Sequence, residues 1–74
     1  MSKLPVISGR EACRRFASIG YRRVRQRGSH MRLIHASNPA RTPLTIPDHS
    51  ELGKGLLRKL IRDAEITLEK FTEL

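Results

Sequence analysis

Residues 25–30 read Arg25-Gln26-Arg27-Gly28-Ser29-His30, a basic run that ends in a turn. The turn separates the segment before it from the segment that begins at His30. Residues 21–27 lie beyond Gly20, a natural helix stop, and contain Tyr and Val, so they are predicted to form a strand. Gly28-Ser29 has the composition of a hairpin turn. Residues 30–35 are predicted to return as the second strand. The turn therefore places His30 at the start of a strand, held by the backbone yet close to solvent.

Successive side chains of a strand point to opposite faces of its sheet. In the second strand this alternation places Met31 and Leu33 on the core side. In the first strand, strict alternation divides the side chains into two groups. One face is expected to carry Tyr21, Arg23, Arg25 and Arg27, and the other Arg22, Val24 and Gln26.

A helix is predicted to precede the hairpin. Ser8 to Glu11 has the Ser-x-x-Glu pattern of a capping box, in which Ser8 is the N-cap and Glu11 reaches back to it. The apolar side chains that follow recur at helical spacing. The pattern predicts a helix over residues 9–19.

A third strand is predicted after the hairpin, over residues 41–46, with Leu44 and Ile46 pointing inward. Pro43 has no backbone N–H to donate to a neighbouring strand. The segment is therefore expected to be an edge strand or to begin late.

Two helices are predicted to complete the chain. Residues 56–64 show an apolar stripe at helical spacing, although Gly53 and Gly55 leave the start of that helix open. Thr67 is placed to cap a short final helix over residues 68–74. The order predicts an α+β fold resembling a double-stranded-RNA-binding domain: α-β-β-β-α, a three-stranded antiparallel sheet with helices on one face, and a short C-terminal helix. Residues 1–74 are expected to be a single domain.

Charge is distributed unevenly along the chain. The formal net charge is +8 and the sequence pI is about 11.1. Residues 1–35 hold nine basic side chains and one acidic residue, Glu11, whereas residues 36–74 hold six of each. Self-repulsion of this size favours a polyanionic partner, and an acidic protein fits the charge as well as a nucleic acid does.

Several other classes of function find no support in the sequence. A single cysteine, Cys13, cannot form an internal disulfide and has no zinc-ligand spacing with the histidines. No apolar run approaches the roughly 18–20 residues of a membrane span, and no signal-peptide core follows Met1. A cytoplasmic location, no metal and no cofactor are therefore expected.

His30 is the strongest candidate for chemistry. Imidazole exchanges protons near neutral pH, as attack of an RNA 2′-hydroxyl on its own phosphodiester requires. Arg25, Arg27 and Arg32 are expected to bind a phosphate beside it. A lone surface histidine is, however, more often structural than catalytic, and the residues by themselves leave that alternative open.

Other residues are assigned supporting parts. Ser29 could hydrogen-bond His30 or a phosphate, and His49 could position RNA or cap the second long helix. Further RNA contacts are expected from Arg22, Arg23 and Lys54.

The order of short motifs resembles the HicA family of toxin mRNA interferases over nearly the whole chain. The matching blocks are Lys3-Leu4-Pro5, Ser8-Gly9, Gly20-Tyr21, residues 25–30, Thr45-Ile46-Pro47-Asp48-His49, Lys54-Gly55 with Leu57-Arg58, and residues 66–71. The resemblance implies ribosome-independent cleavage of mRNA and a cognate HicB antitoxin that covers the active site. It also implies that His30 is the catalytic histidine, with Gly28 and Ser29 as its neighbours.

Two positions depart from the pattern of the family. Many members have Gly-Thr where this chain has Gly55-Leu56, and a helix-ending glycine where it has Glu65. A positive φ at Glu65 would cost on the order of 1 kcal/mol. The function predicted is an endoribonuclease toxin. A non-catalytic RNA-binding module and a basic domain that binds an acidic protein are the alternatives.

Overall fold

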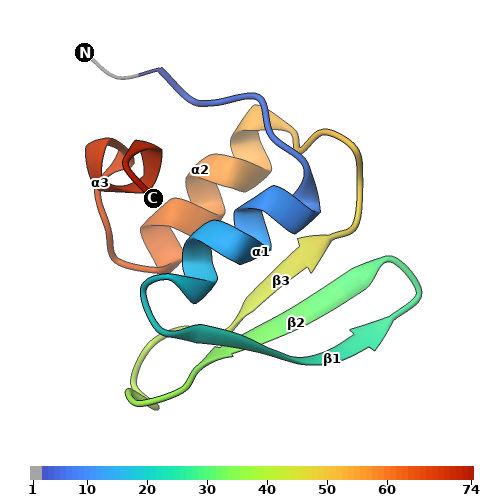
Figure 1. Ribbon diagram of the computed structural model, residues 1–74, viewed down its shortest axis with the longest axis vertical. Helices are drawn as coiled ribbons and strands as arrows, with labels where there is room; N and C mark the ends of the chain where they lie inside the picture. The colour runs from blue at the N-terminus through green and yellow to red at the C-terminus, as the bar shows by residue number, and fades with distance from the viewer. Residues whose placement is uncertain (1–2) are drawn as a thin grey trace.

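The computed structural model describes residues 3–74. The elements in chain order are α1 (Gly9–Ala17), β1 (Tyr21–Arg27), β2 (His30–His35), β3 (Leu44–Pro47), α2 (Lys54–Asp63) and α3 (Leu68–Thr72). The strands form one antiparallel sheet in the order β1-β2-β3. All three helices lie on the same side of the sheet, with α3 beside α1 and α2 (Figure 1). The predicted α+β fold is confirmed, and within residues 3–74 no helix covers the opposite face of the sheet.

The elements differ from the predicted ranges at their ends. Helix α1 stops at Ala17, two residues early, because the N–H groups of residues 18, 19 and 20 bond to carbonyls three residues back and tighten the last turn. Strand β3 starts at Leu44, directly after Pro43, and lies at an edge of the sheet. Helix α2 begins at Lys54, and its N-cap, Gly53, offers no side chain.

The predicted capping box forms only in part. The Ser8 hydroxyl accepts a hydrogen bond from the N–H of Glu11 at 3.0 Å. The Glu11 carboxylate does not return to Ser8 but accepts bonds from Arg14 and Arg15, at 2.6 to 2.9 Å. These two guanidinium groups lower the pKa of Glu11 to about 2.

The core lies between the sheet and the helices. The side chains that fill it from the strands include Met31 and Leu33 of β2 and Leu44 and Ile46 of β3, all of which are buried as predicted. Phe71 of α3 is also fully buried, with its ring centroid 5.1 Å from that of Phe16. Helix α3, capped by Thr67, therefore folds back onto the core.

Strand β1 contains a β-bulge, and the predicted grouping of its side chains is wrong. Arg23 pairs with Leu33 but Arg25 pairs with Arg32, so that Val24 is an extra residue in the strand. Tyr21 and Arg23 therefore face the helices. The extra residue shifts the alternation, and the arginines beyond Val24 face the open side of the sheet.

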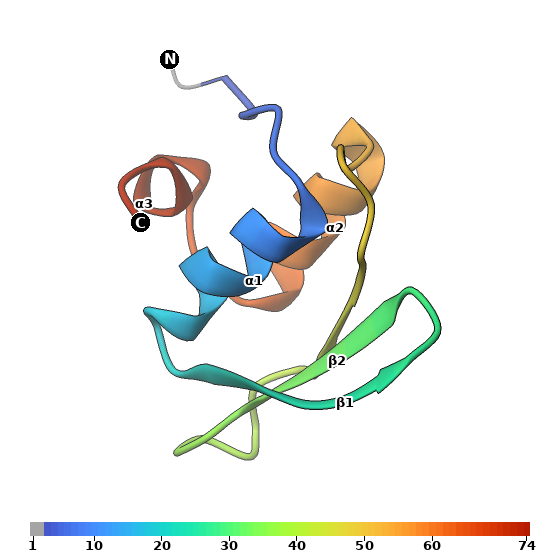
Figure 2. The ribbon, with the colours of Figure 1, turned by 45° about the vertical axis from the view of Figure 1, so that its right-hand side comes forward.

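Three segments meet at the start of α1. The N–H of Gly9 donates to the carbonyl of His49 at 2.9 Å, and a Cβ at residue 9 would overlap the carbonyl oxygen of Pro47. Arg10 makes a bidentate ion pair with Asp48, with N–O distances of 3.0 and 3.1 Å. The N–H of Asp48 in turn donates to the carbonyl of Ser29 in the hairpin turn. In Figure 2 this turn reaches the side of the molecule where the chain leaves β3.

No helix within residues 3–74 has both the length and the apolar character needed to cross a bilayer.

Replacing Glu65 by glycine is expected to stabilise the fold. Glu65 ends α2 with a φ of 59°, a conformation that glycine adopts without steric cost. Glu65→Gly should raise the free energy of unfolding by about 1 kcal/mol in denaturant titrations. Glu65→Ala is the matched control, because it removes the same exposed ion pair with Arg41 but keeps the Cβ. An equal gain in both variants would show that backbone strain is not the cause.

The ion pairs of Glu11 are expected to make stability depend on acidity. Its pKa in the folded protein lies below the ordinary value of 4.5, so its contribution is complete above about pH 4.5 and is lost as the pH falls toward about 2. Denaturant unfolding at a series of pH values should show this loss, and Glu11→Gln should have a flatter profile across the same range. Identical profiles would contradict the assignment.

Candidate nucleic-acid interface

His30 lies in a pocket on the open face of the sheet. The pocket has a volume of about 240 Å³ and is lined by Arg25, Arg27, His30, Arg32 and Thr45. Cross-strand neighbours share a face, and the register pairs Arg27 with His30 and Arg25 with Arg32. The three arginines that were expected to flank His30 are therefore brought together around it.

The bulge at Val24 is what makes this grouping possible. Met31 and Leu33 point to the core, so His30 and Arg32 must point away from it. With unbroken alternation from Tyr21, which is buried under the helices, Arg25 and Arg27 would lie on the helix side. The extra residue moves both arginines to the face that carries His30.

The backbone on either side of His30 is held while its ring stays exposed. Gly28 adopts a φ of 56° in the turn, and the Gln26 side-chain amide donates to the Gly28 carbonyl at 3.1 Å. The Ser29 carbonyl accepts the N–H of Asp48. His30 itself pairs with Pro47 across the β2–β3 ladder. The backbone position of His30 is therefore fixed, and its exposed ring is accessible to a substrate.

Thr45 is a member of the pocket that the sequence analysis did not single out. Its hydroxyl accepts a hydrogen bond from Nη1 of Arg32 at 3.0 Å, which orients the guanidinium across the sheet. Thr45 lies between Leu44 and Ile46, both buried, so alternation alone places it on the open face. That signal was present in the sequence.

The arginines of the sheet differ from those of α1 in their partners. On α1, Arg10 pairs with Asp48, and Arg14 and Arg15 share Glu11. Across residues 3–74, no carboxylate lies within ion-pair distance of the strand arginines, which are Arg22, Arg23, Arg25, Arg27 and Arg32. These strand cations are therefore available to an external anion.

Three of the other predicted site residues lie away from the pocket. Arg23 faces the helices, where its Nη1 is 3.6 Å from the Met31 sulfur. Lys54, at the start of α2, lines a separate hollow that includes Val6 and Arg58. His49 is exposed, and its carbonyl rather than its ring bonds to Gly9.

Arg22 faces the open side of the sheet opposite Ile34, beyond the residues that line the His30 pocket.

His35 has a structural role. Its Nε2 donates to the Ile19 carbonyl at 3.0 Å, and its Nδ1 accepts the N–H groups of Ser37 and Asn38. Both ring nitrogens of His35 are thus occupied by backbone groups.

The family comparison agrees with the resemblance noted in the sequence. A family model described as the HicA toxin of bacterial toxin–antitoxin systems matches residues 9–66, from the start of α1 to just past α2. The match covers well over half of the 74 residues and includes the hairpin with His30. A comparison with curated proteins finds no match. On the strength of the family match, the chain belongs to the HicA family of toxins from bacterial toxin–antitoxin systems.

Proposed function

We propose that this toxin is an endoribonuclease that cleaves mRNA without the ribosome, with His30 as the general acid or base. The observation that carries the proposal is the exposed His30 ring in one pocket with Arg25, Arg27 and Arg32. The pocket joins a group that transfers protons to groups that bind phosphate.

The chemistry is attack of a 2′-hydroxyl on the adjacent phosphorus. The new bond forms a cyclic phosphate, and the bond to the 5′-oxygen of the next nucleotide breaks. Neutral His30 can accept the proton of the 2′-hydroxyl, and protonated His30 can supply a proton to the departing 5′-oxygen. A positioned acid or base contributes on the order of 10²–10⁴ in rate.

The arginines supply the remaining stabilisation in this proposal. Negative charge develops on the phosphate oxygens as the bonds exchange, and guanidinium groups already in place lower its energy. The hydrogen bond from Arg32 to Thr45 fixes one of these groups before RNA binds. Arg22 extends the cationic surface along the open face. Arg23 faces the helices, away from this surface, and Lys54 lines a separate hollow, so any RNA contact made by Lys54 is away from the phosphate beside His30.

We further propose that the cognate HicB-like antitoxin inhibits the enzyme by covering the His30 pocket. Toxins of this family act with an antitoxin partner. Acidic side chains of a protein would bind the strand arginines that RNA phosphates otherwise occupy. Inhibition would then be competition for one set of cations.

His30→Ala is expected to abolish cleavage of a labelled mRNA by purified protein, with and without EDTA. The loss should be on the order of 10²–10⁴ or more, because the only imidazole in the pocket is removed. RNA affinity should change little, since the arginines remain. His49→Ala is the matched control: it removes an exposed histidine outside the pocket and should retain activity within about tenfold.

Two results would overturn the proposal. Undiminished cleavage by His30→Ala would remove the catalytic assignment. RNA that is retarded but intact with the wild-type protein would indicate a binding module without nuclease activity.

The salt dependence of RNA affinity is expected to separate the two faces of β1. On an uncleavable 2′-O-methyl RNA strand, each lost phosphate contact reduces the slope of log K against log salt by about 0.7. Arg25→Gln and Arg27→Gln should each show this reduction. Arg23→Gln, a change of the same kind in the same strand, should leave the slope unchanged because Arg23 faces the helices. A flat slope for the wild-type protein would exclude RNA as the ligand.

A further inference from the structure

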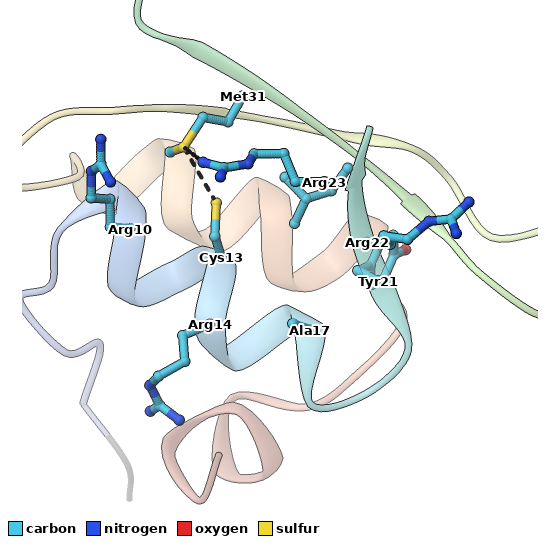
Figure 3. A pocket seen from close by; sticks show the side chains of 9 residues that line it. Arg10, Cys13, Arg14, Ala17, Tyr21, Arg22, Arg23 and Met31 are labelled. Atoms are coloured by element: carbon cyan, nitrogen blue, oxygen red, sulfur yellow. Dashed lines mark hydrogen bonds between the residues drawn. The ribbon is translucent and has the colours of Figure 1, made fainter. Parts of the chain in front are cut away.

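A second pocket lies on the other face of the sheet, between α1 and β1. This α1–β1 groove has a volume of about 410 Å³, and its lining includes Cys13, Ala17, Met31 and Leu33. Figure 3 shows Cys13 and Ala17 on α1, with Met31 across from them on the sheet. The groove is larger than the pocket that holds His30.

The sequence explains why the groove stays open. The positions of α1 that face β1 carry small side chains, Cys13 and Ala17, so the helix leaves space above the strand. Cys13 is only half-buried, with its sulfur 3.8 Å from that of Met31, and burial raises the pKa of its thiol. Ala17 is exposed. Apolar surface therefore remains accessible between the helix and the strand.

Arginines surround this apolar surface. Arg23 extends along the groove, and its guanidinium lies near Met31 (Figure 3). Arg10 and Arg14 project from the rim. Both already pair with carboxylates, whereas within residues 3–74 Arg23 has none in ion-pair distance. The groove thus offers an apolar floor beside the uncompensated positive charge of Arg23.

We propose that the α1–β1 groove is the docking site of an acidic polypeptide segment of the antitoxin, with an apolar side chain inserted between α1 and β1. A carboxylate beside that anchor would pair with Arg23. A polypeptide fits better than RNA, because the accessible apolar surface of the groove comes from the small side chains of Ala17 and Cys13, while Met31 and Leu33 beneath them are buried. The one aromatic in the lining, Tyr21, is buried, and its hydroxyl donates to the Thr42 carbonyl at 2.9 Å, so it offers no platform for base stacking.

The groove and the His30 pocket are separate binding sites on opposite faces of β1. The docking proposal rests on membership of a toxin–antitoxin family and not on the nuclease chemistry. A partner bound in the groove would leave the His30 pocket open unless another part of the same partner crossed the edge of the sheet. Peptide docking and RNA cleavage can therefore be tested independently.

Cys13 provides a direct probe, because it lies in the groove and is the only cysteine of the chain. The rate at which Cys13 is alkylated is measured in the presence and absence of a synthetic amphipathic peptide of glutamate and leucine. At a peptide concentration about ten times its dissociation constant, alkylation should slow about tenfold. A peptide with serine in place of leucine, and one with lysine in place of glutamate, should protect far less.

Charge variants of β1 test on which face of the strand the peptide binds. Arg23→Glu should remove the protection, whereas Arg27→Glu, the same change on the opposite face, should retain it. Ala17→Glu puts a carboxylate on an exposed position of the groove and should also abolish protection. Circular dichroism on each variant confirms that the fold is intact.

Three outcomes would overturn the docking proposal. The first is no protection of Cys13 by the acidic leucine peptide. The second is equal protection by the serine peptide, which would remove the apolar anchor. The third is protection by 2′-O-methyl RNA in place of the peptide, which would make the groove part of the RNA site. RNA cleavage by the same preparation reports separately on the nuclease proposal.

Discussion

The close approach of Gly9 to the segment that follows β3 is the constraint on which the placement of the other elements depends. Because residue 9 has no Cβ, the Pro47 carbonyl can lie against the first turn of α1, and the N–H of Gly9 bonds to His49. The same segment holds the hairpin turn through Asp48 and Ser29. The helix, the end of the third strand and the turn before His30 are therefore fixed to one another, so that an exposed histidine has a well-defined backbone position.

Periodicity predicted most of the fold, and it failed where the chain departs from a regular repeat. Alternation placed the buried residues of β2 and β3, and helical spacing located α1 and α2. In β1 the predicted alternation of side chains is wrong beyond Val24, because one inserted residue moves every later side chain to the other face of the sheet. The bulge contains no glycine that would indicate it in the sequence. The sequence correctly placed Arg25, Arg27 and Arg32 beside His30. It grouped Arg23 with Arg25 and Arg27, which the bulge separates from it, and it passed over Thr45, although Thr45 lies between two buried residues.

The two sets of arginines have different consequences for the free protein. Glu11 pairs with two guanidinium groups on α1 and Asp48 pairs with a third, so each arginine of α1 has a carboxylate partner within the fold. The strand arginines are close in sequence and have no such partners among the described residues. Their mutual repulsion disfavours the compact state of a small domain, and any anionic ligand relieves it. Stability and binding are therefore linked, and both RNA and an acidic protein partner would stabilise the fold.

The bulge in β1 also bears on self-association. A strand at the edge of a sheet exposes unpaired backbone groups that can template pairing with another chain, and bulges and charged side chains are common protections against this. Strand β1 has an outer edge of this kind, and it combines an interruption at Val24 with four arginines. A second copy approaching that edge would meet irregular hydrogen-bonding spacing and like charge. A ligand that neutralised the arginines would remove the electrostatic part of this protection and leave only the bulge to keep two toxin molecules apart.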